Sequence, residues 1–417
     1  MPDSQSSAPL RAAALDRIYT IPGDPATPTL TRLLRERIAA EGALDFAAFM
    51  ATALYHPELG YYARSPRQVG RHGDFFTSVS VGPLFGELLA RRFRRWWQAA
   101  GHPQNWRLIE CGAHDGTLAA DILAALGRLD PAALATLEYV IPEPLPRLQA
   151  AQREKLQPHA ARVRLLTSDA ELASRPLPGI AFGNELLDAL PFEVVEWQAD
   201  GWHSCKVGCG PAGGFCWDTL APLDDPALAA ALAPLGGGFP CGYRSEVRTG
   251  YGGFIAPLLA GLSSGMLLWL DYGFARPDYY HPARHHGTLR TFSGHRAADN
   301  PLLDPGTIDI TAHVDFTAVA EAAGALGCRP LRFCNQGSWL TEVAREWLLA
   351  MEGQPDAGLL RQFQTLTHPA HLGGRFHVLE LAWNDPAPAP LPDADRHRLA
   401  LPAPSQGHDL QSADCRF

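Results

Sequence analysis

Residues 108–118 read LIECGAHDGTL, and this stretch decides the fold. An apolar run that begins at Trp106 and ends at Glu110 is typical of a buried strand. Gly112 and Gly116 then let the backbone turn sharply, and they let a ligand approach without a Cβ in the way. The residues that follow have helical spacing, so the order strand, glycine turn, helix predicts a nucleotide-binding βα unit.

The side chains of this turn favour S-adenosylmethionine over a dinucleotide. His114 and Asp115 stand where the dinucleotide fingerprint has glycines. A carboxylate in the loop repels a pyrophosphate but attracts the positively charged sulfonium of S-adenosylmethionine. We therefore expect Gly112, His114 and Gly116 to contact this cofactor. A nicotinamide oxidoreductase remains as an alternative that the loop disfavours.

Composition limits the function classes. The chain has 417 residues, 46% of them hydrophobic, and a formal net charge of −9, which disfavours binding to nucleic acid or to an anionic membrane. No apolar stretch approaches the roughly 20 residues of a membrane span, and the N-terminus lacks a secretory apolar region. The 8 cysteines lack zinc-site spacing, so we expect no metal and a reducing, cytoplasmic location.

Two acids follow the next predicted strands. Glu143 comes directly after the apolar segment 138–142, where an acid accepts hydrogen bonds from ribose hydroxyls in nucleotide-binding units. Asp169 follows the predicted strand 163–166, and we expect it to face the adenine.

Three polar residues follow the predicted strand 179–182: Asn184, Glu185 and Asp188. Ligands bind at the carboxyl edge of open α/β sheets, so we expect these residues to lie at the ligand site. The alternative is that Asn184 and Glu185 only cap the next helix.

A compact glycine-rich segment, residues 70–86, reads GRHGDFFTSVSVGPLFG and contains Asp74, Thr77 and Ser78. One interpretation is a loop that folds over the cofactor. The alternative is that the two hydroxyls cap the helix expected over 82–97.

The coarse organisation is an α/β chain with four parts. We expect a flexible leader over 1–27, a helical cap with the cofactor-covering loop over 28–105, a core with insertions over 106–384, and a disordered tail over 385–417. Within the core, further strands are expected at 266–270, 332–336 and 376–383, a loop-rich stretch over 208–239, an irregular stretch over 276–308, and a helix from 309 to 325.

Seven blocks carry a family resemblance from about Phe46 to Leu381: LYHPELGYY, GDFFTS, GTLAADIL, NELLDALPFEVVE, DYG, GTLR and DITAHVDF. In this order they resemble the MidA-like family of S-adenosylmethionine-dependent methyltransferases, whose mitochondrial members are protein arginine methyltransferases acting in complex I assembly. The resemblance implies a class I (Rossmann-like) methyltransferase sheet, S-adenosylmethionine as cofactor and a protein substrate.

On this resemblance Glu143 matches the acid that ends the family's second strand, and Asn184 with Glu185 match its Asn-Glu pair. We expect Glu185, Asp188 and Asp74 to act on the acceptor, and Thr77 and Ser78 to cover the cofactor. The family's cofactor loop is close to ELGPGRG, whereas the corresponding stretch of this chain reads ECGAHDG. The family's TSPE motif is here Thr77-Ser78-Val79-Ser80, so its glutamate is missing. These departures leave open an alternative, a catalytically impaired protein with this fold that acts as a binding or assembly factor. The oligomeric state is left open.

Overall fold

The computed structural model describes residues 29–64, 77–211, 213–293, 296–298, 300–351, 353, 355–385 and 391–401. The leader expected over 1–27 and the acid Asp74 lie outside the described residues.

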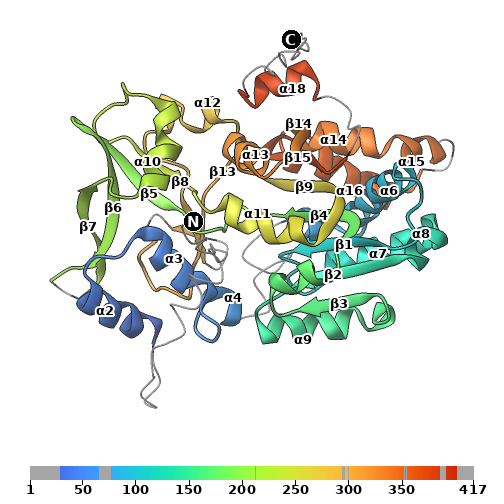
Figure 1. Cartoon of the computed structure of the whole chain (residues 1–417), viewed down its shortest axis with the longest axis horizontal. Helices are drawn as coiled ribbons and strands as arrows, with labels where there is room; N and C mark the ends of the chain where they lie inside the picture. The colour runs from blue at the N-terminus through green and yellow to red at the C-terminus, as the bar shows by residue number, and fades with distance from the viewer. Residues whose placement is uncertain are drawn as a thin grey trace, which may run out of the picture.

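A mainly parallel sheet forms the larger half of the molecule, on the right in Figure 1. Its strand order is β14-β15-β9-β4-β1-β2-β3, with β13 beside the end of β9. Only β15 runs antiparallel to its two neighbours within this described order. The strands are β1 (Trp106–Cys111), β2 (Leu137–Pro142), β3 (Val163–Leu166), β4 (Leu177–Asn184), β9 (Leu262–Phe274), β13 (Val314–Asp315), β14 (Arg329–Asn335) and β15 (Phe376–Trp383).

Successive side chains of the central strands enter two separate cores, one on each face of this sheet. Leu108 packs on one face and Ile109 on the other, as the twofold period of a strand requires. The first face is covered by α6 (Leu84–Ala99), α7 (Thr117–Leu129), α8 (Pro131–Ala135), α14 (Gln336–Val343), α15 (Arg345–Ala350) and α16 (Ala357–Thr367). The second is covered by α11 (Tyr251–Ala260) and α13 (Phe316–Ala325), with α18 (Asp393–Arg398) beside them.

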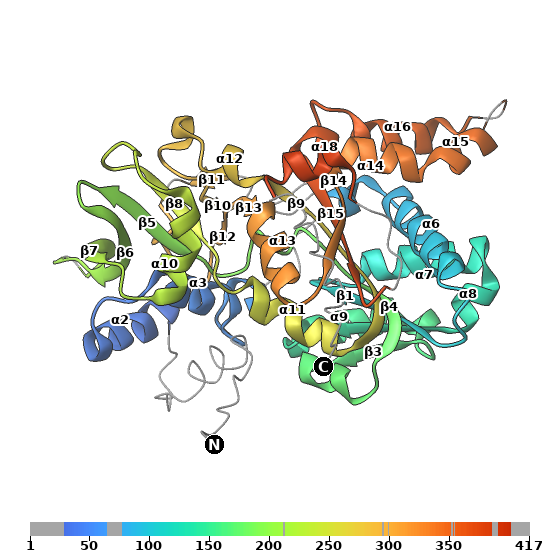
Figure 2. The same cartoon turned by 45° about the horizontal axis from the view of Figure 1, so that its top comes forward.

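Two smaller antiparallel sheets come from insertions after β4 and β9; the first lies on the left in Figure 1, and both are labelled in the left half of Figure 2. Helices α2 (Leu30–Glu41), α3 (Phe46–Tyr55) and α4 (Tyr61–Arg64) share a core with them around Phe46, Phe192 and Ile310. The sheets have the orders β7-β6-β5-β8 and β11-β10-β12. Their strands are β5 (Glu193–Gln198), β6 (Gly201–Cys209), β7 (Phe215–Pro222), β8 (Arg244–Val247), β10 (Arg290–Ser293), β11 (Arg296–Ala298) and β12 (Asp309–Thr311).

The remaining helices are short or peripheral. They are α5 (Ser78–Val81), α9 (Pro146–Lys155), α10 (Pro226–Leu232), α12 (Arg276–Tyr279) and α17 (Leu372–Arg375), with 3₁₀ turns at Gln157–His159, Asp169–Ser174, Ala233–Leu235 and Pro282–Arg284. Of the N-terminal helices, α6 packs on the main sheet, whereas α2 to α4 pack on the inserted sheets.

Several sequence expectations need correction. Strand β7 falls in the stretch expected to be loop-rich, and β10 falls in the stretch expected to be irregular. Residues 309–315 form β12 and β13, and the helix begins only at Phe316, because Asp315 caps it. The tail expected to be disordered contains α18, since Leu391 and Leu399 are buried against the second core.

Candidate functional site

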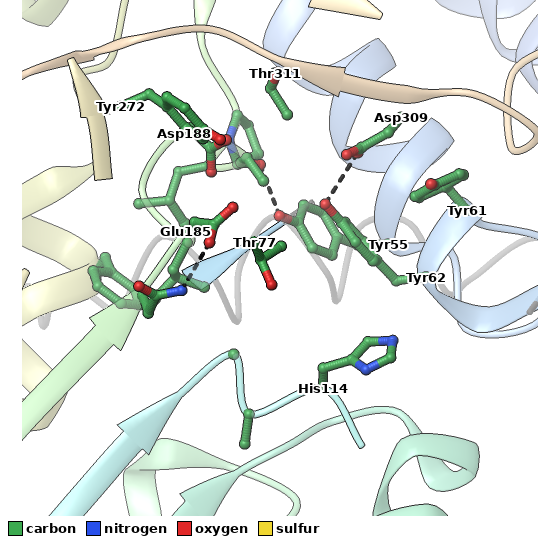
Figure 3. A pocket seen from close by; sticks show the side chains of 18 of the residues that line it. Tyr55, Tyr61, Tyr62, Thr77, His114, Glu185, Asp188, Tyr272, Asp309 and Thr311 are labelled. Carbon is green, nitrogen blue, oxygen red and sulfur yellow. Dashed lines mark hydrogen bonds between the residues drawn. The ribbon is translucent and has the colours of Figure 1, made fainter. Parts of the chain in front are cut away.

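A cavity of about 780 Å³ lies between the carboxyl edge of the main sheet and the inserted sheets (Figure 3). The loops after β1, β2 and β4 form one side, and α3, α4, β10 and β12 form the other. The carboxyl ends of parallel strands meet at one edge of a sheet, so residues distant in the sequence converge here. Cavities of this size hold ligands of the size of a nucleoside.

The turn after β1 has the backbone that its glycines permit. Gly112 and Gly116 adopt φ angles of 74° and 85°, and a Cβ at Gly112 would meet Leu186 at 2.9 Å. Between them His114 also has a positive φ, 47°, which is uncommon for a residue other than glycine. The buried Nε2 of His114 has no hydrogen-bond partner among the described residues. This leaves a nitrogen of the loop available to a ligand.

Asp115, in the same turn, is held by its neighbours. Its Oδ1 accepts the Thr117 N–H at 3.0 Å, and Lys155 Nζ lies 3.1 Å from Oδ2. Burial alone would raise the pKa of Asp115, but hydrogen bonds from His114, Thr117 and Lys155 lower it below the usual range. Lys155 therefore largely offsets the negative charge of Asp115, which we expected to attract the sulfonium.

The end of β2 places Glu143 in the cavity wall, with 6% of its surface exposed. Its Oε1 accepts the Leu145 N–H at 2.9 Å. Gln152, which the sequence analysis did not single out, is buried on α9 and donates to the His114 carbonyl at 2.8 Å and to Glu143 Oε2 at 3.4 Å. Gln152 thus ties the turn after β1 to the acid after β2.

Glu185 follows β4 with a φ of 53°, a left-handed backbone for a non-glycine residue. Its Oε1 accepts hydrogen bonds from Asn184 Nδ2 at 3.0 Å and from the Ser78 N–H at 3.2 Å. Burial, and then the neighbouring charge of Asp188, raise the pKa of Glu185 to about 8. Burial raises the pKa of Asp188 to about 6, against the opposing effect of Arg248. Two proximate carboxylates of raised pKa therefore face one cavity.

Two buried charged residues fix the loop that presents these carboxylates. Asp271, at the end of β9, accepts through Oδ2 the N–H groups of Leu186, Leu187 and Asp188 at 3.0, 2.7 and 3.3 Å, and through Oδ1 the N–H of Tyr272. Burial, followed by the charges of Asp188 and Glu185, raises the pKa of Asp271, and its hydrogen bonds oppose this.

Arg248 binds the carbonyls of the same loop from the opposite side. It donates to the carbonyls of Asp188 and Leu190, and also to those of Ala312 and His313, which join β12 to β13. Arg248 was not found in the sequence, where nothing distinguishes it from other arginines.

Tyrosines line the opposite wall (Figure 3). Tyr55 donates to the Ala189 carbonyl at 2.7 Å, and Tyr62 donates to Asp309 Oδ1 at 3.0 Å. The two rings stack with centroids 5.4 Å apart. These residues were not predicted individually, although they belong to the blocks LYHPELGYY and DITAHVDF.

The candidate residues of the sequence analysis fall into three groups. Nine of them lie in or beside the cavity: Gly112, His114, Gly116, Glu143, Asn184, Glu185, Asp188, Thr77 and, behind the wall, Ser78. Thr77 lines the cavity while its hydroxyl caps α5, and not the longer α6 as expected. Ser78 is buried behind Glu185, with its hydroxyl 3.3 Å from Gln336 Oε1.

Asp169 is not among the described residues that line the cavity. Beyond β3 the Ser168 side chain caps the turn Asp169–Ser174, and a contact of Asp169 with the adenine stays a prediction. The third group is Asp74, which lies outside the described residues.

A sheet of this order, with one antiparallel strand beside the edge and a glycine turn after β1, defines a Rossmann-like methyltransferase that uses S-adenosylmethionine. The family described as "Putative S-adenosyl-L-methionine-dependent methyltransferase" matches residues 88–334. The chain belongs to this family, as the sequence resemblance indicated.

Solved and curated relatives agree. A "likely methyl transferase" from Burkholderia thailandensis, crystallised with S-adenosyl-homocysteine, is 32% identical, with a TM-score of 0.77, covering 93% of this chain and 97% of that one. The mitochondrial protein arginine methyltransferase NDUFAF7 of Homo sapiens is 28% identical over 86% of this chain and 84% of its own length. The Drosophila melanogaster homologue is 28% identical over 85% and 84%. The cofactor is therefore S-adenosylmethionine, and the oxidoreductase alternative is wrong.

The expected cytoplasmic location is contradicted by these comparisons, because the curated relatives are named as mitochondrial proteins. None of the described helices is both long enough and apolar enough to cross a membrane.

Proposed function

We propose that the chain transfers a methyl group to an arginine side chain of a protein. The observation that carries the proposal is the pair of buried carboxylates, Glu185 and Asp188, facing the cavity opposite the tyrosine wall. Carboxylates hold a guanidinium through charge-assisted hydrogen bonds, and aromatic rings add cation–π attraction. An arginine acceptor is also supported by the curated relatives, which are named as protein arginine methyltransferases.

The residues at the β1 and β2 end fit the cofactor. Gly112 and Gly116 have positive φ angles and bring the turn after β1 to the cavity without side chains, the Nε2 of His114 lacks a partner among the described residues, and Glu143 ends β2 in the wall. We assign the glycines to close backbone approach and Glu143 to the ribose hydroxyls. S-adenosylmethionine supplies a methyl group carried on a positively charged sulfur.

Methylation of a guanidinium requires a group at the acceptor end of the cavity that takes up a proton. A guanidinium has a pKa above 12 and no free lone pair, so one N–H proton must leave as the new N–C bond forms. Glu185, with a pKa raised to about 8 by burial, is a stronger base than an ordinary carboxylate once ionised. We assign proton acceptance to Glu185 and guanidinium orientation to Asp188. Both roles remain predictions from the geometry.

Isotope transfer tests the proposal. The purified chain is incubated with methyl-labelled S-adenosylmethionine and arginine-containing peptides, and the labelled residue is identified after hydrolysis. Glu185→Gln should lower the rate at least about 100-fold, the scale of a lost proton acceptor. Glu36→Gln, an exposed surface carboxylate on α2, is the matched control. Label on another residue type, or an unchanged rate in Glu185→Gln, would overturn the assignment.

The impaired-scaffold alternative rests on His114 and Asp115 in the cofactor loop, and it has its own test. Calorimetric titration with S-adenosylmethionine and S-adenosylhomocysteine should show binding that Glu143→Ala weakens. The offset of the Asp115 charge by Lys155 favours a working pocket. Absence of binding by both compounds would favour the scaffold.

A further inference from the structure

The charges that line the cavity are separated by depth. The lining carboxylates are buried or half-buried: Glu110, Asp115, Glu143, Glu185, Asp188 and Asp309. The two lining residues that are both charged and exposed are arginines, Arg290 and Arg375. The interior therefore suits a cation, whereas the mouth suits anions.

Both arginines belong to the acceptor side of the cavity. Arg290 begins β10 and pairs in register with Thr311 of β12, which also lines the cavity. Arg375 ends α17 directly before β15, which lies beyond β9 and β4 from the cofactor strands β1 and β2. Neither arginine is placed to hold the ribose or adenine of a cofactor bound at β1 and β2.

Neither guanidinium is neutralised by an acid among the described residues. Arg290 donates to its neighbouring carbonyl of Leu289 at 2.7 Å, and Arg375 forms no ion pair with any described side chain. Several other described arginines pair with carboxylates, as Arg92 does with Glu380 at 2.8 Å. The chain as a whole carries a formal charge of −9, so two exposed arginines of the cavity lining without an acidic partner among the described residues differ in sign from the prevailing charge.

We propose that Arg290 and Arg375 bind acidic residues that flank the acceptor, so that the substrate is an arginine in a segment rich in Asp or Glu. This inference rests on the proposed function, because the acceptor cation enters the acidic interior while its neighbours remain at the mouth. Neighbours in an extended segment advance about 3.3 Å per residue, so acids a few positions away lie outside the cavity. Opposite charges arranged in this way select partners and orient them.

Peptide binding tests the inference. Fluorescence anisotropy would measure two labelled peptides with one central arginine, flanked by glutamates or by lysines, in the presence of S-adenosylhomocysteine. The wild-type chain should bind the acidic peptide roughly threefold to tenfold more tightly, as two exposed ion pairs allow, and the difference should shrink at high salt. The double variant Arg290→Glu/Arg375→Glu should reverse the preference. Arg361→Glu, an exposed arginine of α16 outside the described cavity lining, should not.

The outcomes separate this inference from the proposed function. Equal binding of the two peptides, including no binding of either, or an unchanged preference in the double variant, would overturn the role of the two arginines. A preference for acidic flanks that the double variant reverses supports that role even if no methyl transfer occurs. In that case the proposed methylation of arginine would be wrong, whereas the role of the two arginines would stand.

Discussion

At the scale of single residues, Glu185 combines two features that oppose stability. Its φ of 53° is unfavourable for a residue with a side chain, and its carboxyl is buried with a pKa raised to about 8. Between the ordinary pKa of 4.5 and this value, the folded chain holds a proton that the unfolded chain releases. The contribution of Glu185 to the free energy of unfolding therefore falls as pH rises through this window.

We expect Glu185→Gln to be more stable than the wild type at high pH, although we expect its methyl transfer to be slower. Glutamine does not titrate, so the gain should be near zero at pH 4 and on the order of 1–3 kcal/mol at pH 9. Thermal unfolding of both proteins across this range measures it. A gain that is largest at low pH would contradict the burial of an uncompensated carboxylate.

We expect Asp271 to affect the reaction through the loop that it holds, and Asp271→Asn tests this. An amide offers one oxygen to the N–H groups of residues 186–188, but its NH₂ then faces the Tyr272 N–H. We expect kcat to fall about 10-fold to 100-fold, as for a misplaced reacting group, with cofactor affinity within about twofold.

The matched control for Asp271→Asn is Asp395→Asn, which removes another buried carboxylate, bound to the Phe333 N–H outside the cavity. This control should lose stability but keep its kcat. Equal loss of kcat in both variants would show a general effect of destabilisation.

At the scale of elements, the cofactor loop is held against α7 and α9 by Asp115. We expect Asp115→Ala to weaken binding of S-adenosylmethionine and S-adenosylhomocysteine by the same factor, about threefold to tenfold, because Lys155 already offsets the carboxylate charge. Calorimetry with both compounds measures this. If only the affinity for S-adenosylmethionine fell, the result would instead support a direct attraction between Asp115 and the sulfonium.

Asp130→Ala is the control for the loss of a helix-terminal hydrogen bond, because Asp130 caps α8 outside the described cavity lining. It should cost about 1 kcal/mol of stability and leave both affinities unchanged.

The elements of the main sheet could be predicted because each is an apolar run between turn signals. Strands β3 and β15 have the predicted bounds, 163–166 and 376–383. Of the inserted strands, β5 and β6 lie where alternating side chains predict paired strands, over 192–197 and 202–207. Strands β10, β11 and β12 were missed because they are short and polar, and the pairing of β10 with β12 depends on residues distant in the sequence. Helix α18 was missed because only Leu391 and Leu399 anchor a segment of otherwise polar composition.

The candidate site was partly predictable because several of its residues follow directly after strands that the sequence predicts. Acids at strand ends, such as Glu143 and Glu185, are visible in the sequence and line the cavity, although their roles stay predictions. Gln152 and Arg248 could not be found, because each gains its role only from contacts with loops far along the chain. Asp169 also follows a strand but is not among the described lining residues, so its position after a strand did not by itself predict a place in the cavity wall.

At the scale of the whole molecule, Arg248 joins the main sheet to the inserted sheets. Arg248→Lys replaces a planar fork with a point charge and leaves buried carbonyls without donors, which should cost about 2–4 kcal/mol. We expect faster hydrogen exchange at residues 309–313 in particular.

Arg107→Lys is the matched control for Arg248→Lys, because Arg107 is equally buried but binds Glu138 and the Gly261 carbonyl within the main sheet. It should leave exchange at 309–313 unchanged. The same exchange pattern in both variants would contradict a specific link between the two halves.

The position of β15 has a consequence for synthesis on the ribosome. This strand comes last in the sequence of the sheet, yet it inserts between β9 and β14. Until residues 376–383 emerge, the apolar strand β9, which carries Asp271, presents an unpaired edge on the nascent chain. Such an edge is a template for pairing with other chains. The nascent protein is therefore vulnerable to aggregation from the emergence of β9 until β15 has emerged and paired with it.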